Sequence, residues 1–205
     1  AFSLKKKAKS QKYRVPKAEA EGAVLPNKLQ LTKAKEIDHA ELEGFLHAYN
    51  VLFDELSVET AFDLHYIFRI HQLALGHLYS FAGKLRTVNI SKGGFLFPPA
   101  KFLYQKMDEF EKTILKKLPA QYESADTLIS DIARIHAELL FIHPFREGNG
   151  RTARLLADLM AGKAGYPFLN LEDFRKKKFS DYVSAIRQAA TGDYSQMEKI
   201  IRSLF

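Results

Sequence analysis

The stretch I-H-P-F-R-E-G-N-G-R-T-A-R, residues 142–154, lies between two apolar segments, residues 126–141 and residues 151–163. In both segments apolar side chains recur at steps of three and four residues, which is typical of helices that bury one face. Pro144 disfavours a helical backbone at the residue before it. The sequence therefore predicts a helix, a loop that begins at His143, and a second helix.

The end of this loop is predicted to bind an anion. Residues 148–150 read Gly-Asn-Gly, a backbone that can gather unpaired N–H groups at the start of a helix. Asn149 is also a candidate helix cap. Arg151 and Arg154 share a helix face, in a turn where the helix dipole disfavours cations by about 0.3–1 kcal/mol. Two arginines there favour a polyanion such as a triphosphate, because guanidinium groups bind phosphate oxygens in pairs.

Two further side chains of the stretch could do chemistry. Glu147 would repel the same phosphates unless a divalent cation bridges them, and Mg²⁺ is bound in this way, by one or two carboxylates and phosphate oxygens. His143 can exchange a proton near neutral pH. A single histidine, a single Gly-x-Gly or two arginines would also fit a structural role or a solvated surface. The joint pattern favours a nucleotide site.

Residues 143–154 match the signature of the Fic family (filamentation induced by cAMP), H-P-F-x-[D/E]-G-N-G-R-x-x-R, at every position. Most members transfer AMP from ATP to a hydroxyl group of a target protein. The resemblance implies that His143 deprotonates this hydroxyl and that Glu147 binds Mg²⁺. It further implies roles for the other signature residues, with Gly148, Asn149 and Gly150 forming the anion hole, Asn149 contacting the α-phosphate, Arg151 holding the γ-phosphate, Arg154 holding the β/γ side, and Phe145 anchoring the loop in the core.

One position separates two branches of this family. The Doc branch, which transfers phosphate, typically has lysine where this chain has Gly150. The difference favours AMP transfer for this chain.

A shorter segment changes from helical to strand-like spacing. Residues 87–99 contain β-branched residues, a Gly-Gly pair and aromatic residues before two prolines, which predicts a hairpin. With the preceding G-x-x-R, residues 83–86, it resembles the flap of Fic proteins, which we place at residues 84–99. The resemblance implies that the flap lies over the nucleotide and pairs its edge with the target protein, through Thr87, Val88, Asn89, Ile90, Ser91, Lys92 and Gly93.

The chain has 205 residues, 46% of them hydrophobic, which is enough for one domain with its own core. Helical spacing dominates, so we expect a mostly α fold, a Fic-type helical bundle with a small β-hairpin flap over the active site. Residues 1–24 are expected to form a basic, flexible arm and residues 25–205 the Fic domain. The expected helices span residues 34–56, 62–78, 101–118, 126–141, 151–163, 174–190 and 194–204, and the first should turn Leu42, Phe45, Tyr49, Leu52 and Leu56 inward.

Composition excludes several classes of protein. The chain has no cysteine, which excludes disulfides, thiolate metal sites and cysteine catalysis. No apolar run approaches the length of a membrane span, and the N-terminus lacks the apolar core of a secretory signal. A bacterial cytoplasmic location is expected, with export as an effector into a host cell left open. The net charge is +7, but the basic residues are not interleaved with stacking aromatics, so nucleic acid is not expected as a partner.

We therefore expect an enzyme, a Mg²⁺-dependent protein adenylyltransferase that uses ATP as its substrate and modifies a Tyr, Thr or Ser hydroxyl. Two alternatives stay open. One is a nucleotide-binding regulatory or interaction module without turnover, although pure binding needs neither a base nor a metal ligand. The other is a Fic variant that transfers another phosphate-containing group.

Many Fic proteins are inhibited by a helix with the pattern [S/T]-x-x-x-E-[G/N], whose Glu pairs with the second signature arginine, Arg154 here. Residues 17–22, K-A-E-A-E-G, come close to this pattern and would supply Glu21. Lys17, however, stands where Ser or Thr is expected. We predict that no residue of this chain occupies the γ-phosphate pocket and that any inhibitor is a separate, antitoxin-type partner.

Overall fold

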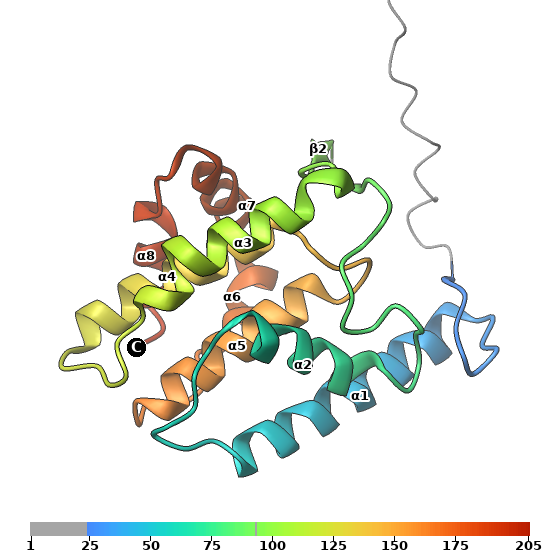
Figure 1. Ribbon diagram of the computed structural model, residues 1–205, viewed down its shortest axis with the longest axis horizontal. Coiled ribbons are helices and arrows are strands. Elements are labelled where there is room, and N and C mark those ends of the chain that lie inside the picture. Colours follow the sequence, from blue (N-terminus) through green and yellow to red (C-terminus); the bar gives the residue numbers. More distant parts are fainter. Residues whose placement is uncertain (1–23, 93) are drawn as a thin grey trace, which may run out of the picture.

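The computed structural model describes residues 24–92 and 94–205. This part of the chain is mostly α-helical, as predicted, with eight α-helices and one small hairpin (Figure 1). The helices are α1 (Ala34–Asp54), α2 (Leu64–Leu75), α3 (Leu103–Thr113), α4 (Ala125–Ile142), α5 (Asn149–Lys163), α6 (Leu171–Lys177), α7 (Phe179–Gln188) and α8 (Ser195–Arg202). No helix in the described ranges combines the length and the apolar content needed to cross a bilayer. The predicted basic arm up to residue 23 and Gly93 of the predicted flap lie outside the described residues.

Helices α4 and α5 form the centre of the fold (Figure 1). Helix α4 begins after Ser124, whose hydroxyl accepts a hydrogen bond from the N–H of Thr127 (3.3 Å), as expected for an N-cap. Helix α5 packs against α1, α2 and α4, and α4 also packs against α3, α7 and α8. Their predicted apolar faces are buried: Leu128, Ile132, Ile135 and Leu139 of α4, and Leu155, Leu156, Leu159 and Met160 of α5. The signature loop is therefore held between two helices that are packed on several sides.

Helices α1 and α2 pack together through a close approach at Gly44. A Cβ added at Gly44 would lie 1.9 Å from the carbonyl oxygen of Ala74. The predicted inner face of α1 is right for Phe45 and Leu52 but wrong for Leu42, which is 55% exposed. Because Gly44 has no side chain, it allows the two backbones to approach at this point. The buried residues of α1 are Ile37, Ala40, Glu41, Gly44, Phe45, Ala48 and Leu52.

The predicted hairpin is present, as strands β1 (Ser91–Lys92) and β2 (Phe95–Leu96), which pair antiparallel. It is shorter than residues 87–99, because two consecutive prolines follow β2 closely and proline has no N–H to extend a ladder. The ring of Phe95 packs edge-on against Phe141 of α4 (centroids 6.1 Å apart). The hairpin is thus attached to the helix that leads into the signature loop.

The C-terminal part differs from the prediction at one position. The single helix expected at residues 174–190 is divided into α6 and α7 at Lys178, where the backbone leaves the helical region (φ −133°, ψ 52°). No proline or glycine marks this break in the sequence. Helix α8 lies within the range predicted for it and buries Met197, Ile200 and Ile201.

Candidate active site

His143 ends α4 in a left-handed backbone conformation (φ 52°, ψ 60°), consistent with the exclusion of a helical backbone before proline. Its Nδ1 lies 3.1 Å from the carbonyl oxygen of Leu140. A carbonyl only accepts, so Nδ1 carries the proton and Nε2 keeps its lone pair. Burial lowers the pKa of His143 to about 4, and the ring stacks on Phe97 (centroids 3.9 Å apart). At neutral pH the side chain is therefore a neutral imidazole with Nε2 as its proton acceptor.

Asn149 closes the loop rather than capping the helix. Its Oδ1 accepts from the N–H of Phe145 (2.8 Å) and its Nδ2 donates to the carbonyl of the same residue (2.7 Å). The N-cap position is Gly148 instead, so the predicted cap is wrong. Phe145 is fully buried, and Asn149 holds it there through both backbone groups. The contact of Asn149 with an α-phosphate stays a prediction.

His71 of α2 packs against the signature loop and hydrogen-bonds to it, a role that the sequence did not suggest. Its Nδ1 accepts from the N–H of Gly83 (2.8 Å), so Nε2 carries the proton and donates to the carbonyl of Glu147 (2.9 Å). The ring stacks on Phe145 at 3.9 Å, and burial lowers its pKa to about 4. A neutral histidine thus joins α2, the start of the flap region and the signature loop. Its partners, Gly83 and Glu147, lie 12 and 76 residues away, so nothing local in the sequence identified them.

The backbone at Gly148 is shaped for close approach. Its φ of 77° is one that other residues rarely adopt, and an added Cβ would lie 2.8 Å from the Cδ1 of Leu75. The N–H of Gly148 donates to the Oε1 of Glu147 (2.7 Å), which shows that this group faces an anionic oxygen. The first N–H groups of α5 have no partner within the helix. The loop and helix start can therefore bind an anion.

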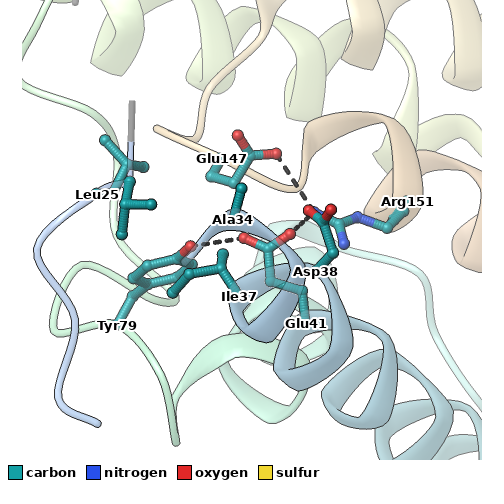
Figure 2. A pocket seen from close by; sticks show the side chains of 9 residues that line it. Leu25, Ala34, Ile37, Asp38, Glu41, Tyr79, Glu147 and Arg151 are labelled. Atoms are coloured by element: carbon teal, nitrogen blue, oxygen red, sulfur yellow. Dashed lines mark hydrogen bonds and ion pairs between the residues drawn. The ribbon is translucent and has the colours of Figure 1, made fainter. Parts of the chain in front are cut away.

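Arg151 is held by a buried acid from the first helix. Its Nη2 donates to the Oε2 of Glu41 (2.6 Å) and lies 3.3 Å from the Oε1 of Glu147, and its guanidinium lies over the ring of Phe45 (4.8 Å). The hydroxyl of Tyr79 donates to the other oxygen of Glu41 (2.6 Å), and Figure 2 shows this chain of contacts. Glu41 lies 110 residues before Arg151, so no local pattern could connect them.

A cavity of about 330 Å³ opens beside Arg151. Three carboxylates line it, from Asp38, Glu41 and Glu147 (Figure 2). The side chain of Glu147 is 44% exposed, which suits an ion that takes its other ligands from phosphate oxygens and water. Glu147 is thus the residue of the signature loop that could hold a divalent cation.

Arg154, one turn further along α5, faces a different part of the chain. Its Nη2 lies 3.0 Å from the Oε2 of Glu172 in α6. Burial lowers the pKa of Arg154, and the nearby hydroxyl of Tyr182 in α7 opposes that shift. Glu172 is thus a carboxylate of the chain itself that contacts Arg154, and that no residue of the chain occupies the γ-phosphate pocket stays a prediction. Glu172 does not fit the inhibitory pattern, because Phe168, four residues earlier, stands where the pattern has Ser or Thr. Glu21, from the near match at residues 17–22, lies outside the described residues.

Arg86, the last residue of the G-x-x-R segment, ties the flap to the signature loop. It is only 4% exposed, and burial lowers its pKa to about 10, so it stays charged at neutral pH. Its side chain donates to the carbonyls of His143 (2.7 Å), Val88 (2.7 Å) and Pro98 (2.6 Å). Its backbone N–H donates to the carbonyl of Pro144 (2.8 Å). One buried guanidinium thus fixes both ends of the flap beside His143.

The structure brings the predicted loop and flap residues together. The signature residues form one loop and the first turns of α5. Phe97, which follows β2, stacks on His143, and the charge of Lys92 in β1 contributes to lowering the pKa of His143. The described residues of the predicted docking segment, 87–92, are exposed or half-buried. The hairpin therefore lies close to the base and keeps an accessible edge.

Comparison with known proteins points to one family. The model of the Fic/DOC family matches residues 61–161. The chain is 29% identical over 173 residues to a protein adenylyltransferase Fic of Nematostella vectensis, which covers 83% of this chain and 39% of that protein. It is 26% identical over 191 residues to the protein adenylyltransferase VbhT of Bartonella schoenbuchensis, which covers 91% of this chain and 38% of that protein. The chain thus spans about two fifths of the length of these curated relatives.

Solved structures show the same fold. The Fic domain of a VirB-translocated effector from Bartonella quintana superimposes with a TM-score of 0.72 at 18% identity, over 91% of this chain and 90% of that one. The BepC effector of Bartonella tribocorum, crystallised with AMPPNP, gives a TM-score of 0.69 at 18% identity, over 91% and 94%. With the complete signature in one loop, the hairpin beside it and the matching family model, the chain belongs to the Fic/DOC family.

Proposed function

We propose that this chain transfers AMP from ATP to a hydroxyl group of a target protein. The observation that carries the proposal is the state of His143, whose Nδ1–H is fixed by Leu140, so that Nε2 is a base next to the flap. A base in this place is needed for transfer and not for binding alone. The adenylyltransferase names of the relatives and the AMPPNP bound to BepC support the choice of ATP.

The reaction follows from the placement of these groups. The target oxygen attacks the α-phosphorus, its proton passes to Nε2 of His143, and the bond from the α-phosphorus to the bridging oxygen breaks to release pyrophosphate. Arg151 and Arg154 would neutralise the terminal phosphates, and the Gly148 region would face the α-phosphate oxygens. Glu147 would hold Mg²⁺, which neutralises phosphate charge when bound. Catalysis of this kind consists mainly of positioning and charge neutralisation.

The target would dock on the flap by adding a strand to its accessible edge. The N–H of Phe97 donates to the carbonyl of Ile90 (3.2 Å), so Ile90 faces β2. Because backbone groups alternate in an antiparallel ladder, the N–H and C=O of Ser91 point away from β2. Ser91 would therefore pair with the target chain. The similarity to VirB-translocated Bartonella effectors supports export from a bacterial cytoplasm. A separate antitoxin-type inhibitor would be a further partner.

Isotope-labelled ATP and a His143→Ala variant test the proposal together. The chain is incubated with a cell lysate and ATP labelled at either the α or the γ phosphate. Label from the α position alone should appear on protein, and His143→Ala should lower this rate by about 10²–10⁴ while ATP affinity is kept. His65→Ala, which removes an exposed histidine of α2, is the control.

Two results would contradict the proposal. Label from the γ position would indicate phosphate transfer. ATP binding without any labelled protein, in the unaltered chain and in His143→Ala alike, would indicate a regulatory module without turnover.

A further inference from the structure

Two buried side chains that lie outside the signature, Tyr182 and His136, form a hydrogen-bonded set next to Arg154. The side chain of Arg154 is only 16% exposed, and the hydroxyl of Tyr182 lies near enough to oppose the lowering of the Arg154 pKa by burial. Tyr182 of α7 is 3% exposed and His136 of α4 is 1% exposed. The hydroxyl of Tyr182 lies 2.5 Å from the Nε2 of His136, and the Nδ1 of His136 lies 3.2 Å from the carbonyl of Ala153. These contacts join three helices around one guanidinium.

The chemistry of each group fixes the direction of every hydrogen bond. The carbonyl of Ala153 can only accept, so the Nδ1 of His136 carries a proton. Burial lowers the pKa of His136 to about 3, so the ring is neutral and Nε2 must accept the proton of Tyr182. The oxygen of Tyr182 then has only lone pairs to offer to the nearby guanidinium of Arg154. Because Ala153 and Arg154 are neighbours in α5, this series of contacts, through His136 and Tyr182, starts and ends on the same turn of α5.

We propose that Tyr182, oriented by His136, is a positioning residue that holds the guanidinium of Arg154 in place for the terminal phosphates of ATP. The inference rests on the proposed function. Glu172 also contacts Arg154 (3.0 Å), but its side chain is 37% exposed and pairs with Arg175 as well (2.7 Å). A phosphate oxygen can replace that carboxylate, since both are anionic and Glu172 keeps Arg175. A phosphate oxygen cannot reach the hydroxyl of Tyr182 in the same way, because this hydroxyl is enclosed between α4 and α5.

The substitution Tyr182→Phe removes the oxygen at nearly constant volume and leaves the ring in the core. The lone pair of His136 then loses its partner, and the guanidinium of Arg154 loses the oxygen that faces it, in a buried place, which costs free energy unless the guanidinium moves. AMP lacks the phosphates assigned to Arg154, so its affinity should not depend on this change. The ratio of ATP to AMP affinity therefore separates positioning of Arg154 from a general loss of structure.

The experiment measures the dissociation constants of ATP and AMP by calorimetry, with Mg²⁺ present, for the full chain. Tyr182→Phe should weaken ATP binding by about tenfold and leave AMP binding within about twofold. In an Arg154→Ala background the same change should have no further effect on ATP. Tyr194→Phe is the matched control, because Tyr194 donates to Glu138 on the same helix α4 (2.5 Å) without touching Arg154, and its ATP affinity should be unchanged.

Several other outcomes of this experiment would contradict the inference. An equal loss of ATP and AMP affinity, or a loss that persists without Arg154, would show that Tyr182 only stabilises the fold. Unchanged ATP affinity in Tyr182→Phe would overturn the inference while the proposed function stands. If the unaltered chain does not bind ATP more tightly than AMP, the proposed function fails first and the inference falls with it.

Discussion

Arg151 and Arg154 occupy adjacent turns of one helix, yet each is paired with a carboxylate from a distant part of the chain. Glu41 of α1 holds the first and Glu172 of α6 contacts the second. The two acids differ in burial, since the side chain of Glu41 is 7% exposed and that of Glu172 is 37% exposed. A buried partner maintains the position of an arginine, whereas a partly exposed one competes with an incoming anion.

Replacing Glu172 with glutamine should therefore strengthen ATP binding. Arg154 would lose a competing charge but keep Tyr182, and a partly exposed ion pair contributes on the order of 0.3–1 kcal/mol. We expect ATP affinity to rise about two- to fivefold, measured by calorimetry. The control is Asp173→Asn, which removes the neighbouring exposed carboxylate. Weaker ATP binding in Glu172→Gln would mean that Glu172 holds Arg154 rather than competing for it.

Replacing Gly150 with alanine should change protein stability and ATP affinity in opposite directions. It lies within α5, where alanine is more stable than glycine by about 0.5–1 kcal/mol. A Cβ at this position would, however, lie 3.1 Å from the Nη1 of Arg154. Gly150→Ala should keep or raise the melting temperature while ATP affinity falls roughly three- to tenfold. In an Arg154→Ala background the affinity loss should disappear; if it persists, the methyl group acts on the anion hole itself.

At the scale of elements, the hairpin presents one edge to solvent through backbone groups. The predicted strand addition makes Ser91 the decisive position, because its N–H and C=O point away from β2. Ser91→Pro removes that N–H without removing a bond of the hairpin. Labelling of the target should fall at least about tenfold, the equivalent of one strong hydrogen bond, while ATP affinity is kept. Ser91→Ala, which alters only the side chain, should label normally; equal effects of both changes would exclude main-chain pairing.

Much of this architecture is readable from local sequence, and its failures have definite causes. Spacing identified the central helices, and residue chemistry identified the signature loop with His143 and its neighbours. Spacing gave the wrong orientation for Leu42, because α1 approaches α2 through Gly44, which has no side chain. It also missed the break at Lys178, because no proline or glycine marks the end of α6. The partners of Arg151 could not be found, since Glu41 reaches it only through the packing of α1 against α5.

At the scale of the whole molecule, neutral histidines link the site to the core. His71 and His136 are almost fully buried, at 0% and 1% exposure, and burial lowers their pKa values to about 4 and about 3. Each joins two or more helices or loops through its ring nitrogens. Protonation of either ring would break one of these bonds, because each ring has one nitrogen that must accept.

Stability should therefore fall as the solution becomes acidic. The folded-state pKa values lie below the ordinary value of 6.5, so below pH 6.5 the unfolded chain binds protons that the folded chain does not. Each of the two histidines should remove about 1.4 kcal/mol per pH unit between pH 6 and the folded pKa. Urea unfolding at pH 7, 6 and 5 measures this slope. His71→Gln should reduce the slope of unfolding free energy against pH by the contribution of one proton. An unaltered slope would show that carboxylates cause the loss of stability.

The contacts of Arg86 have a consequence for how such proteins diverge. Within residues 24–92 and 94–205, the hydrogen bonds of its guanidinium all go to main-chain carbonyls, those of His143, Val88 and Pro98. Every amino acid supplies the same carbonyl, so the side chains of the flap can mutate without moving the flap away from the base. Under the proposed function, a lineage could change its target by changing the side chains of the flap, while Arg86 would keep the flap aligned with His143.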